Sequence, residues 1–221
     1  MTADDNPLIQ NDLRPIRGWS VVIFLAVLPL LLLPAVWLIG SREMLVMLAL
    51  FFISSLIALA VAVAPMGWRA LPALGFRPAG FWPIVLGAVG ALVVSVAVTQ
   101  FGIEPEGVKQ AMDVARTPAL FAASLAVMAL LAPLVEEVVF RGLLYGWVAG
   151  RWGTTVAWFV SSVLFADAHV EPAHALLVLP LGLWFGWLRQ RTDSLWPSLV
   201  AHIVNNGLAV VAAAYISGSS P

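Results

Sequence analysis

Runs of about 20 apolar residues recur along this chain, and they limit its fold more than any other feature. The first run, GWSVVIFLAVLPLLLLPAVWLIG at 18–40, contains no charged side chain. Apolar residues make up 62% of the 221 residues, and they gather in long runs instead of alternating with polar residues. Because a helix of roughly 20 apolar residues crosses a bilayer, the sequence predicts an all-α polytopic membrane protein.

About seven segments qualify as transmembrane helices, and an eighth span is the alternative that would change the topology. The seven segments are 18–40, 44–66, 81–101, 118–150, 153–169, 172–189 and 195–216. The stretch RALPALGFRPAG between the second and third segments is predicted to be a loop, because proline and glycine interrupt it. The longest loop, 102–118, is predicted to contain a short surface helix. We divide the chain into an N-terminal segment (1–17), N-terminal membrane helices (18–114) and a C-terminal membrane domain (115–217).

Charge and cysteine content exclude several classes of function. The net charge is −1 and there is no basic tail, so no nucleic-acid partner is expected. The chain has no cysteine, which excludes disulfides, thiolate catalysis and cysteine-ligated zinc. With seven spans, one side of the membrane receives Arg14, Arg17, Arg69, Arg77, Arg151, Arg189 and Arg191, and the other receives Arg42, Lys109 and Arg116. The positive-inside rule therefore predicts a cytoplasmic N-terminus.

Charged side chains interrupt the fourth apolar segment. The stretch PLVEEVVFRGLLYG contains Glu136, Glu137 and Arg141. A charge at the bilayer centre costs at least ~2.5 kcal/mol, so such residues are rare and indicate a functional site. Residues four apart share one face of a helix, which predicts an ion pair between Glu137 and Arg141. Glu136 lies about 100° around the helix and is predicted to stay outside this pair.

Two later motifs place more polar side chains inside apolar segments. FADAH brings Phe165 and His169 onto one helix face, and HIVNN does the same for His202 and Asn206. If the fourth and fifth segments form a hairpin, Glu136 and His169 are each about sixteen residues from the turn and lie at one depth. His202 is offset by ~9 Å at 1.5 Å per residue. A carboxylate, two imidazoles and a carboxamide that converge in this way predict a hydrolytic centre.

The three motifs, in this order, resemble the signature of a known family. EEVVFR fits EExxxR, FADAH fits FxxxH, and HIVNN fits HxxxN. Together they are similar to the CAAX protease and bacteriocin-processing family (CPBP, or Abi) of intramembrane proteases, which includes the type II CAAX prenyl endopeptidases. The resemblance covers roughly residues 115–215, and it identifies 115–217 as a catalytic membrane domain whose site lies among its four helices.

The resemblance also implies roles for individual residues. It assigns Glu136 and His169 to activating a water molecule, and His202 and Asn206 to binding the oxyanion of a tetrahedral intermediate. Supporting roles fall to Glu137, Arg141 and Phe165. No cofactor is expected. The alternative is one zinc ion held by Glu136, His169 and His202, which is less favoured because asparagine, the fourth polar residue, is a poor zinc ligand.

The expected function is hydrolysis of a peptide bond in a membrane-associated protein or peptide. A CAAX-type peptide, a leader peptide and a C-terminal sorting tail fit this expectation equally well. Two alternatives are a catalytically silent family member that acts as a bacteriocin-immunity or scaffold protein, and a proton-coupled transporter. The complete set of polar residues favours an enzyme, and the absence of internal repeats disfavours a transporter. The short chain predicts an integral protein of a prokaryotic cytoplasmic membrane.

Overall fold

The structure is a computed structural model, and it describes residues 16–41, 43–102 and 117–217. Its helical elements, in chain order, are α2 (Gly18–Ile39), α3 (Met44–Val63), the 3-10 segment η2 (Ala64–Arg69), α4 (Ala70–Leu74), α5 (Phe81–Thr99), α7 (Pro118–Ser124), the π-helical segment η3 (Leu125–Leu131), α8 (Ala132–Glu136), the π-helical segment η4 (Glu137–Leu144), α9 (Tyr145–Trp152), α10 (Thr154–Asp167), α11 (Pro172–Thr192) and α12 (Trp196–Ser217). The segments from α7 to α9 follow one another without a break and form one long rod. The described residues contain no β-strand, and the predicted all-α polytopic membrane fold is confirmed.

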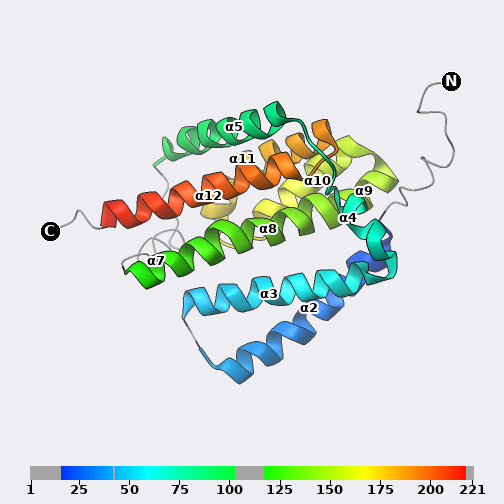
Figure 1. The fold of residues 1–221 in the computed structure, drawn as a ribbon, viewed down its shortest axis with the longest axis horizontal. Helices are drawn as coiled ribbons and strands as arrows, with labels where there is room; N and C mark the ends of the chain where they lie inside the picture. The colour runs from blue at the N-terminus through cyan, green and yellow to red at the C-terminus, as the bar shows by residue number, and fades with distance from the viewer. Residues whose placement is uncertain (1–15, 42, 103–116, 218–221) are drawn as a thin grey trace.

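Five helices of the described chain are long and apolar enough to cross a membrane. They are Gly18–Ile39, Met44–Leu74, Phe81–Thr99, Pro118–Trp152 and Trp196–Ala214. The other two predicted spans are helices as well, but they do not reach this standard. α10 has only 14 residues, and α11 ends in a polar run that includes Arg189 and Arg191. If the α7–α9 rod is taken as one helix, the long helices from α2 to α12 alternate in direction, and α10 and α11 belong to the same bundle (Figure 1).

The prediction of a loop after the second span is wrong in its first half, because α4 (Ala70–Leu74) forms there. Gly67 turns the chain with a φ of 55°, and α4 then begins. Pro72 is tolerated in the first turn of α4, where backbone N–H groups have no partner within the helix. Gly75 ends the helix with a φ of 96°, a conformation that glycine adopts without steric cost.

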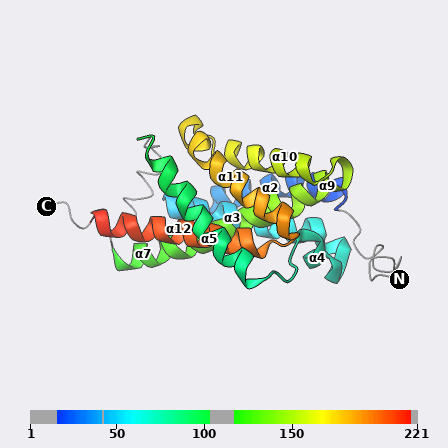
Figure 2. The same cartoon turned by 90° about the horizontal axis from the view of Figure 1, so that it is seen from above.

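The α7–α9 rod, α10, α11 and α12 pack together, and the candidate site lies among them. α12 lies between α5 and the α7–α9 rod (Figure 1), and it packs against both. α11 packs against α10 on one side and α5 on the other (Figure 2). The α2–α3 hairpin covers the opposite side of the rod. α5 therefore packs with the C-terminal helices, although it precedes them in sequence. The predicted domain boundary near 114 and most of the predicted surface helix at 102–118 lie outside the described residues.

Arginine side chains gather at one end of the bundle. The start of α2, the α4 region, the end of α9 and the end of α11 meet at this end in both views (Figure 1, Figure 2). These segments contain Arg17, Arg69, Arg77, Arg151, Arg189 and Arg191. The opposite end contains the α2–α3 and α10–α11 connections. The six arginines give the first end a basic character, and the positive-inside rule associates basic ends with the cytoplasm.

Candidate active site

A buried ion pair lies at the centre of the candidate site. Arg141 Nη1 is 3.2 Å from Glu137 Oε1, at the predicted spacing of four residues, and both side chains are fully buried. Arg141 Nη2 donates to the carbonyl of Gly182 on α11 at 2.8 Å. The guanidinium also lies over the ring of Phe165 on α10, 4.2 Å from its centroid. Because a buried charge without its partners is costly, these contacts hold η4 firmly against α10 and α11.

His202 of α12 joins the two glutamates. Its Nδ1 lies 3.2 Å from Glu137 Oε1, and its Nε2 lies 3.5 Å from Glu136 Oε2. The imidazole stacks on Phe185, with 4.7 Å between ring centroids. The depth offset estimated from helix lengths, ~9 Å, does not separate His202 from Glu136. The reason is that α9 extends past the start of α12 (Figure 1, Figure 2), so counting from the turns overestimates the difference in depth.

The adjacent glutamates have different surroundings. The side chain of Glu137 is 0% exposed and contacts both Arg141 and His202. The side chain of Glu136 is 19% exposed, and its ion-pair contact is with His202. Glu137 is therefore placed to fix the positions of its neighbours, whereas Glu136 is the carboxylate that keeps accessible surface.

His169 of the α10–α11 connection also packs against Phe165. Its Nδ1 is 3.0 Å from the carbonyl of Phe165, and its ring meets the ring of His174 at 4.7 Å between centroids. Phe165 packs edge-on against both His169 and His202, at centroid distances of 5.1 and 5.7 Å. Within the described residues no ion pair of 4.0 Å or less joins His169 to Glu136. The expectation that His169 and Glu136 together activate a water molecule stays a prediction.

Asn206 is held by an unusual backbone carbonyl. Its side-chain N–H donates to the carbonyl of Met128 in η3 at 3.1 Å. In an α-helix this carbonyl would accept from the N–H of Ala132, but Ala132 donates to Val127 instead. In a π-helix it would accept from residue 133, which is proline and has no N–H. The local sequence thus leaves the Met128 carbonyl available to the asparagine.

Four residues that complete the site were not predicted from the sequence: Ser162, Gly182, Phe185 and Arg189. Ser162 Oγ lies 2.9 Å from the Gly182 carbonyl that also accepts from Arg141. Arg189 is 3% exposed, and its Nε donates to the Arg141 carbonyl at 3.1 Å. Phe185 and Arg189 are four residues apart on α11, a spacing that could have indicated a shared inward face. Gly182 gives no such signal in the sequence.

The predicted zinc ligands do not converge in this structure. In the described parts of the chain, no three side chains among His, Asp and Glu lie close enough together to hold a metal ion. Glu136 contacts His202, whereas the contacts of His169 are with Phe165 and His174.

Comparisons with known proteins match the part of the chain that contains this site. Residues 118–208 match a family model described as type II CAAX prenyl endopeptidase Rce1-like. A Bacillus subtilis (strain 168) protein named "Putative membrane peptidase YdiL" is 30% identical over 113 residues, which cover 50% of this chain and 45% of the relative. The chain thus spans less than half the length of this relative. No solved structure matches the chain.

The matched region and the geometric site coincide. The matched residues 118–208 contain all three motifs and the four residues Glu136, His169, His202 and Asn206. The resemblance drawn from these motifs is confirmed, since residues 118–208 of this chain match the type II CAAX prenyl endopeptidase Rce1-like family model and the relative is a named membrane peptidase.

Proposed function

We propose that this chain is an intramembrane endopeptidase that hydrolyses a peptide bond of a membrane-associated protein or peptide. The observation that carries the proposal is the position of His202. Buried Glu137 holds one ring nitrogen at 3.2 Å, and the other nitrogen lies 3.5 Å from the partly exposed Glu136. An accessible base beside an oriented hydrogen-bond donor is what hydrolysis of an amide requires.

The proposed reaction begins at Glu136. Its carboxylate accepts a proton from a water molecule while the water oxygen attacks the carbonyl carbon of the substrate, and the carbonyl electrons move to oxygen. In its protonated form His202 donates Nδ1–H to Glu137 and presents Nε2–H to the developing oxyanion. The intermediate then collapses, the C–N bond breaks, and the proton on Glu136 passes to the leaving nitrogen.

Two other residues assist this reaction in the proposal. Asn206 has a second side-chain N–H besides the one given to Met128, and this N–H supports the oxyanion. His169 acts from across the Phe165 ring, at the outer edge of the cluster, where it orients the entering water or peptide. Phe165 contacts both imidazoles and lies under the Arg141 guanidinium, which keeps the three groups in fixed positions.

The proposed substrate rests on the matched family, and the proposed orientation in the membrane rests on the positions of the arginines. The name of the matched family indicates a prenylated CAAX peptide, and a leader peptide or a C-terminal tail would use the same chemistry. The basic end of the bundle supports a cytoplasmic N-terminus in a prokaryotic cytoplasmic membrane. Glu136 and His202 lie in the interior of the bundle, so the scissile bond must enter between helices.

The test is the substitution Glu136→Gln, which keeps the shape of the side chain and removes its basicity. Membranes from bacterial cells that produce the wild-type chain or the variant are compared by mapping the protein termini that appear. We expect termini that depend on the wild-type chain to vanish in Glu136→Gln and to persist in Glu43→Gln, which changes an exposed carboxylate at the start of α3. Both variants must insert at wild-type levels.

Two outcomes would contradict the proposal. Undiminished cleavage by Glu136→Gln would remove Glu136 from the mechanism and favour another base. An identical set of termini with and without the wild-type chain, together with a phenotype that Glu136→Gln leaves intact, would favour the scaffold alternative. Transport by the purified chain in liposomes that depends on a proton gradient would favour the transporter.

A further inference from the structure

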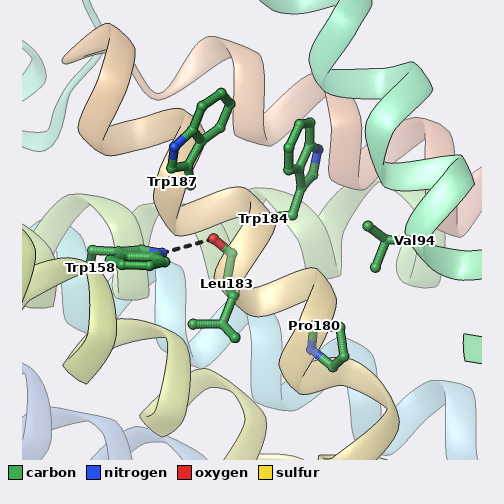
Figure 3. Close-up of a pocket in the computed structure, with 6 residues that line it drawn as sticks. All are labelled: Val94, Trp158, Pro180, Leu183, Trp184 and Trp187. Carbon is green, nitrogen blue, oxygen red and sulfur yellow. Dashed lines mark hydrogen bonds between the residues drawn. The ribbon is translucent and has the colours of Figure 1, made fainter.

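An open groove lies between α5, α10 and α11, on a face of the bundle that does not include the candidate site. Its volume is about 290 Å³, and six side chains line it: Val94, Trp158, Pro180, Leu183, Trp184 and Trp187 (Figure 3). It follows α11 from Pro180 to Trp187, a length of ~10 Å at 1.5 Å per residue. Because these helices belong to a membrane bundle, the groove faces lipid hydrocarbon.

Two of the three indole N–H groups that line the groove have partners within the protein. The indole N–H of Trp184 donates to the carbonyl of Gly87 at 2.9 Å, and that of Trp158 donates to the carbonyl of Leu183 at 2.9 Å (Figure 3). Both donors are thus used within the protein, and the tryptophans present their apolar faces. A hydrocarbon fills such a largely apolar space without disturbing these two hydrogen bonds.

Glycines shape the walls of the groove. A side chain at Gly90 of α5 would overlap the ring of Trp184, and one at Gly186 would lie 2.8 Å from Trp158 Cδ1. Trp184 also stacks on Trp187, with 5.0 Å between centroids and 18° between planes. The indoles are therefore held in place by backbone contacts and by each other, so the groove is a fixed feature of the fold.

A cation stands at the end of the groove. Arg191 lies one helical turn beyond Trp187, and its guanidinium carbon is 5.6 Å from the Trp187 ring centroid. Its side chain is exposed, and among the described residues no carboxylate pairs with it. Arg191 belongs to the basic end of the bundle, where lipid headgroups are expected. An exposed arginine in this position attracts the phosphate of an anionic lipid.

We propose that this groove binds one anionic phospholipid, with an acyl chain along Val94, Leu183 and Trp184 and the phosphate at Arg191. The volume is close to the lower limit of small-molecule pockets, so it holds part of one chain and not a whole lipid. The site is separate from the proposed peptidase chemistry. The bound lipid joins α5 to α10 and α11, and it stabilises the packing behind Gly182 and Arg141.

The experiment uses the full chain purified in detergent, freed of lipid, and mixed with phosphatidylglycerol or with phosphatidylcholine of the same acyl chains. Native mass spectrometry counts the lipid molecules that remain bound. We expect one retained phosphatidylglycerol on the wild-type chain. Val94→Trp should lose this lipid because the new indole fills the groove, whereas Val93→Trp, on an exposed position of the same helix, should keep it. Arg191→Gln should lower the preference for phosphatidylglycerol about fivefold.

Each other outcome overturns part or all of the proposal. Equal retention by Val94→Trp and Val93→Trp would exclude the groove as the lipid site. An unchanged preference in Arg191→Gln would exclude the phosphate contact, and this variant changes an exposed side chain, so it tests the proposal even if Val94→Trp fails to fold. Conversion of a wild-type dimer to a monomer by Val94→Trp would show that a second copy of the chain occupies the groove.

Discussion

At the scale of single residues, the site separates two carboxylates that are neighbours in sequence. Glu137 is buried between Arg141 and His202, and Glu136 is partly exposed with His202 alone. One positive charge and one imidazole thus fix Glu137, while the base next to it keeps access to water. Burial and partners, not residue type, give the two glutamates different roles.

The first prediction at this scale concerns stability. Glu137→Gln removes the charge that compensates fully buried Arg141, and breaking such a pair costs about 3–5 kcal/mol. The adjacent substitution Glu136→Gln leaves the Glu137–Arg141 pair in place. It should therefore lower the free energy of unfolding by less than about 1 kcal/mol. Thermal unfolding of both variants in detergent measures the difference. Equal shifts of the two melting temperatures would contradict the view that Glu137 is the structural member.

Part of this arrangement could be predicted from the sequence. The Glu137–Arg141 pair follows from helical spacing alone, and it is present at 3.2 Å. The contact between His202 and both glutamates could not be derived in that way, because it depends on how far α9 extends past the start of α12. Helix lengths do not give the offset between neighbouring hairpins, and that offset sets the depth of each residue.

At the scale of helical elements, two wide turns of the α7–α9 rod each release a backbone carbonyl toward the site. In η3 the released carbonyl is that of Met128, which accepts from Asn206. In η4 the N–H of Tyr145 donates to Phe140 and Gly142, and the carbonyl of Arg141 accepts from Arg189 Nε at 3.1 Å. Such π-helical turns are rare and are frequently found at functional sites. Here each turn lets a side chain of another helix bond to the rod.

The second prediction concerns Pro133. Pro133→Ala restores an N–H that can bond to the Met128 carbonyl, and it removes the steric reason for the wide turn. Asn206 would then lose its partner, so we expect the cleavage rate to fall about tenfold, the effect of ~1.4 kcal/mol. Thermal stability should stay the same or rise, since proline inside a helix is unfavourable. A purely structural role would lower both quantities together.

A matched control for this variant is Pro34→Ala, because Pro34 also lies inside a helix but belongs to α2, far from the site in sequence. It should not change the cleavage rate. An unchanged rate in Pro133→Ala, together with a loss of activity in Asn206→Ala, would show that the asparagine is oriented by something other than Met128. The sequence predicted the long helix through this region, but periodicity of apolar residues gives no signal for the wide turns, because a uniformly apolar run looks alike in both conformations.

At the scale of the whole molecule, the question is whether α10 and α11 cross the membrane with the five more apolar helices. α10 has 14 residues, about 21 Å at 1.5 Å per residue, which is shorter than the hydrocarbon core of a bilayer. The sequence correctly predicted helices at both places, since their apolar runs are clear. It could not assign the depth of α10 in the membrane. A short helix is tolerated where neighbouring helices cover it, and α11, α9 and η4 pack against α10.

The third prediction tests this arrangement with single cysteines, which is possible because the chain has none of its own. Val170 in the α10–α11 connection is 87% exposed, and Trp152 at the end of α9 is 57% exposed. If α10 crosses and the basic end is cytoplasmic, a membrane-impermeant maleimide should label Val170→Cys in intact cells and Trp152→Cys only after permeabilisation. The reverse pattern would invert the proposed orientation. Labelling of both from one side would mean that α10 does not cross, and His169, next to Val170, would then lie at the same membrane face as the basic end.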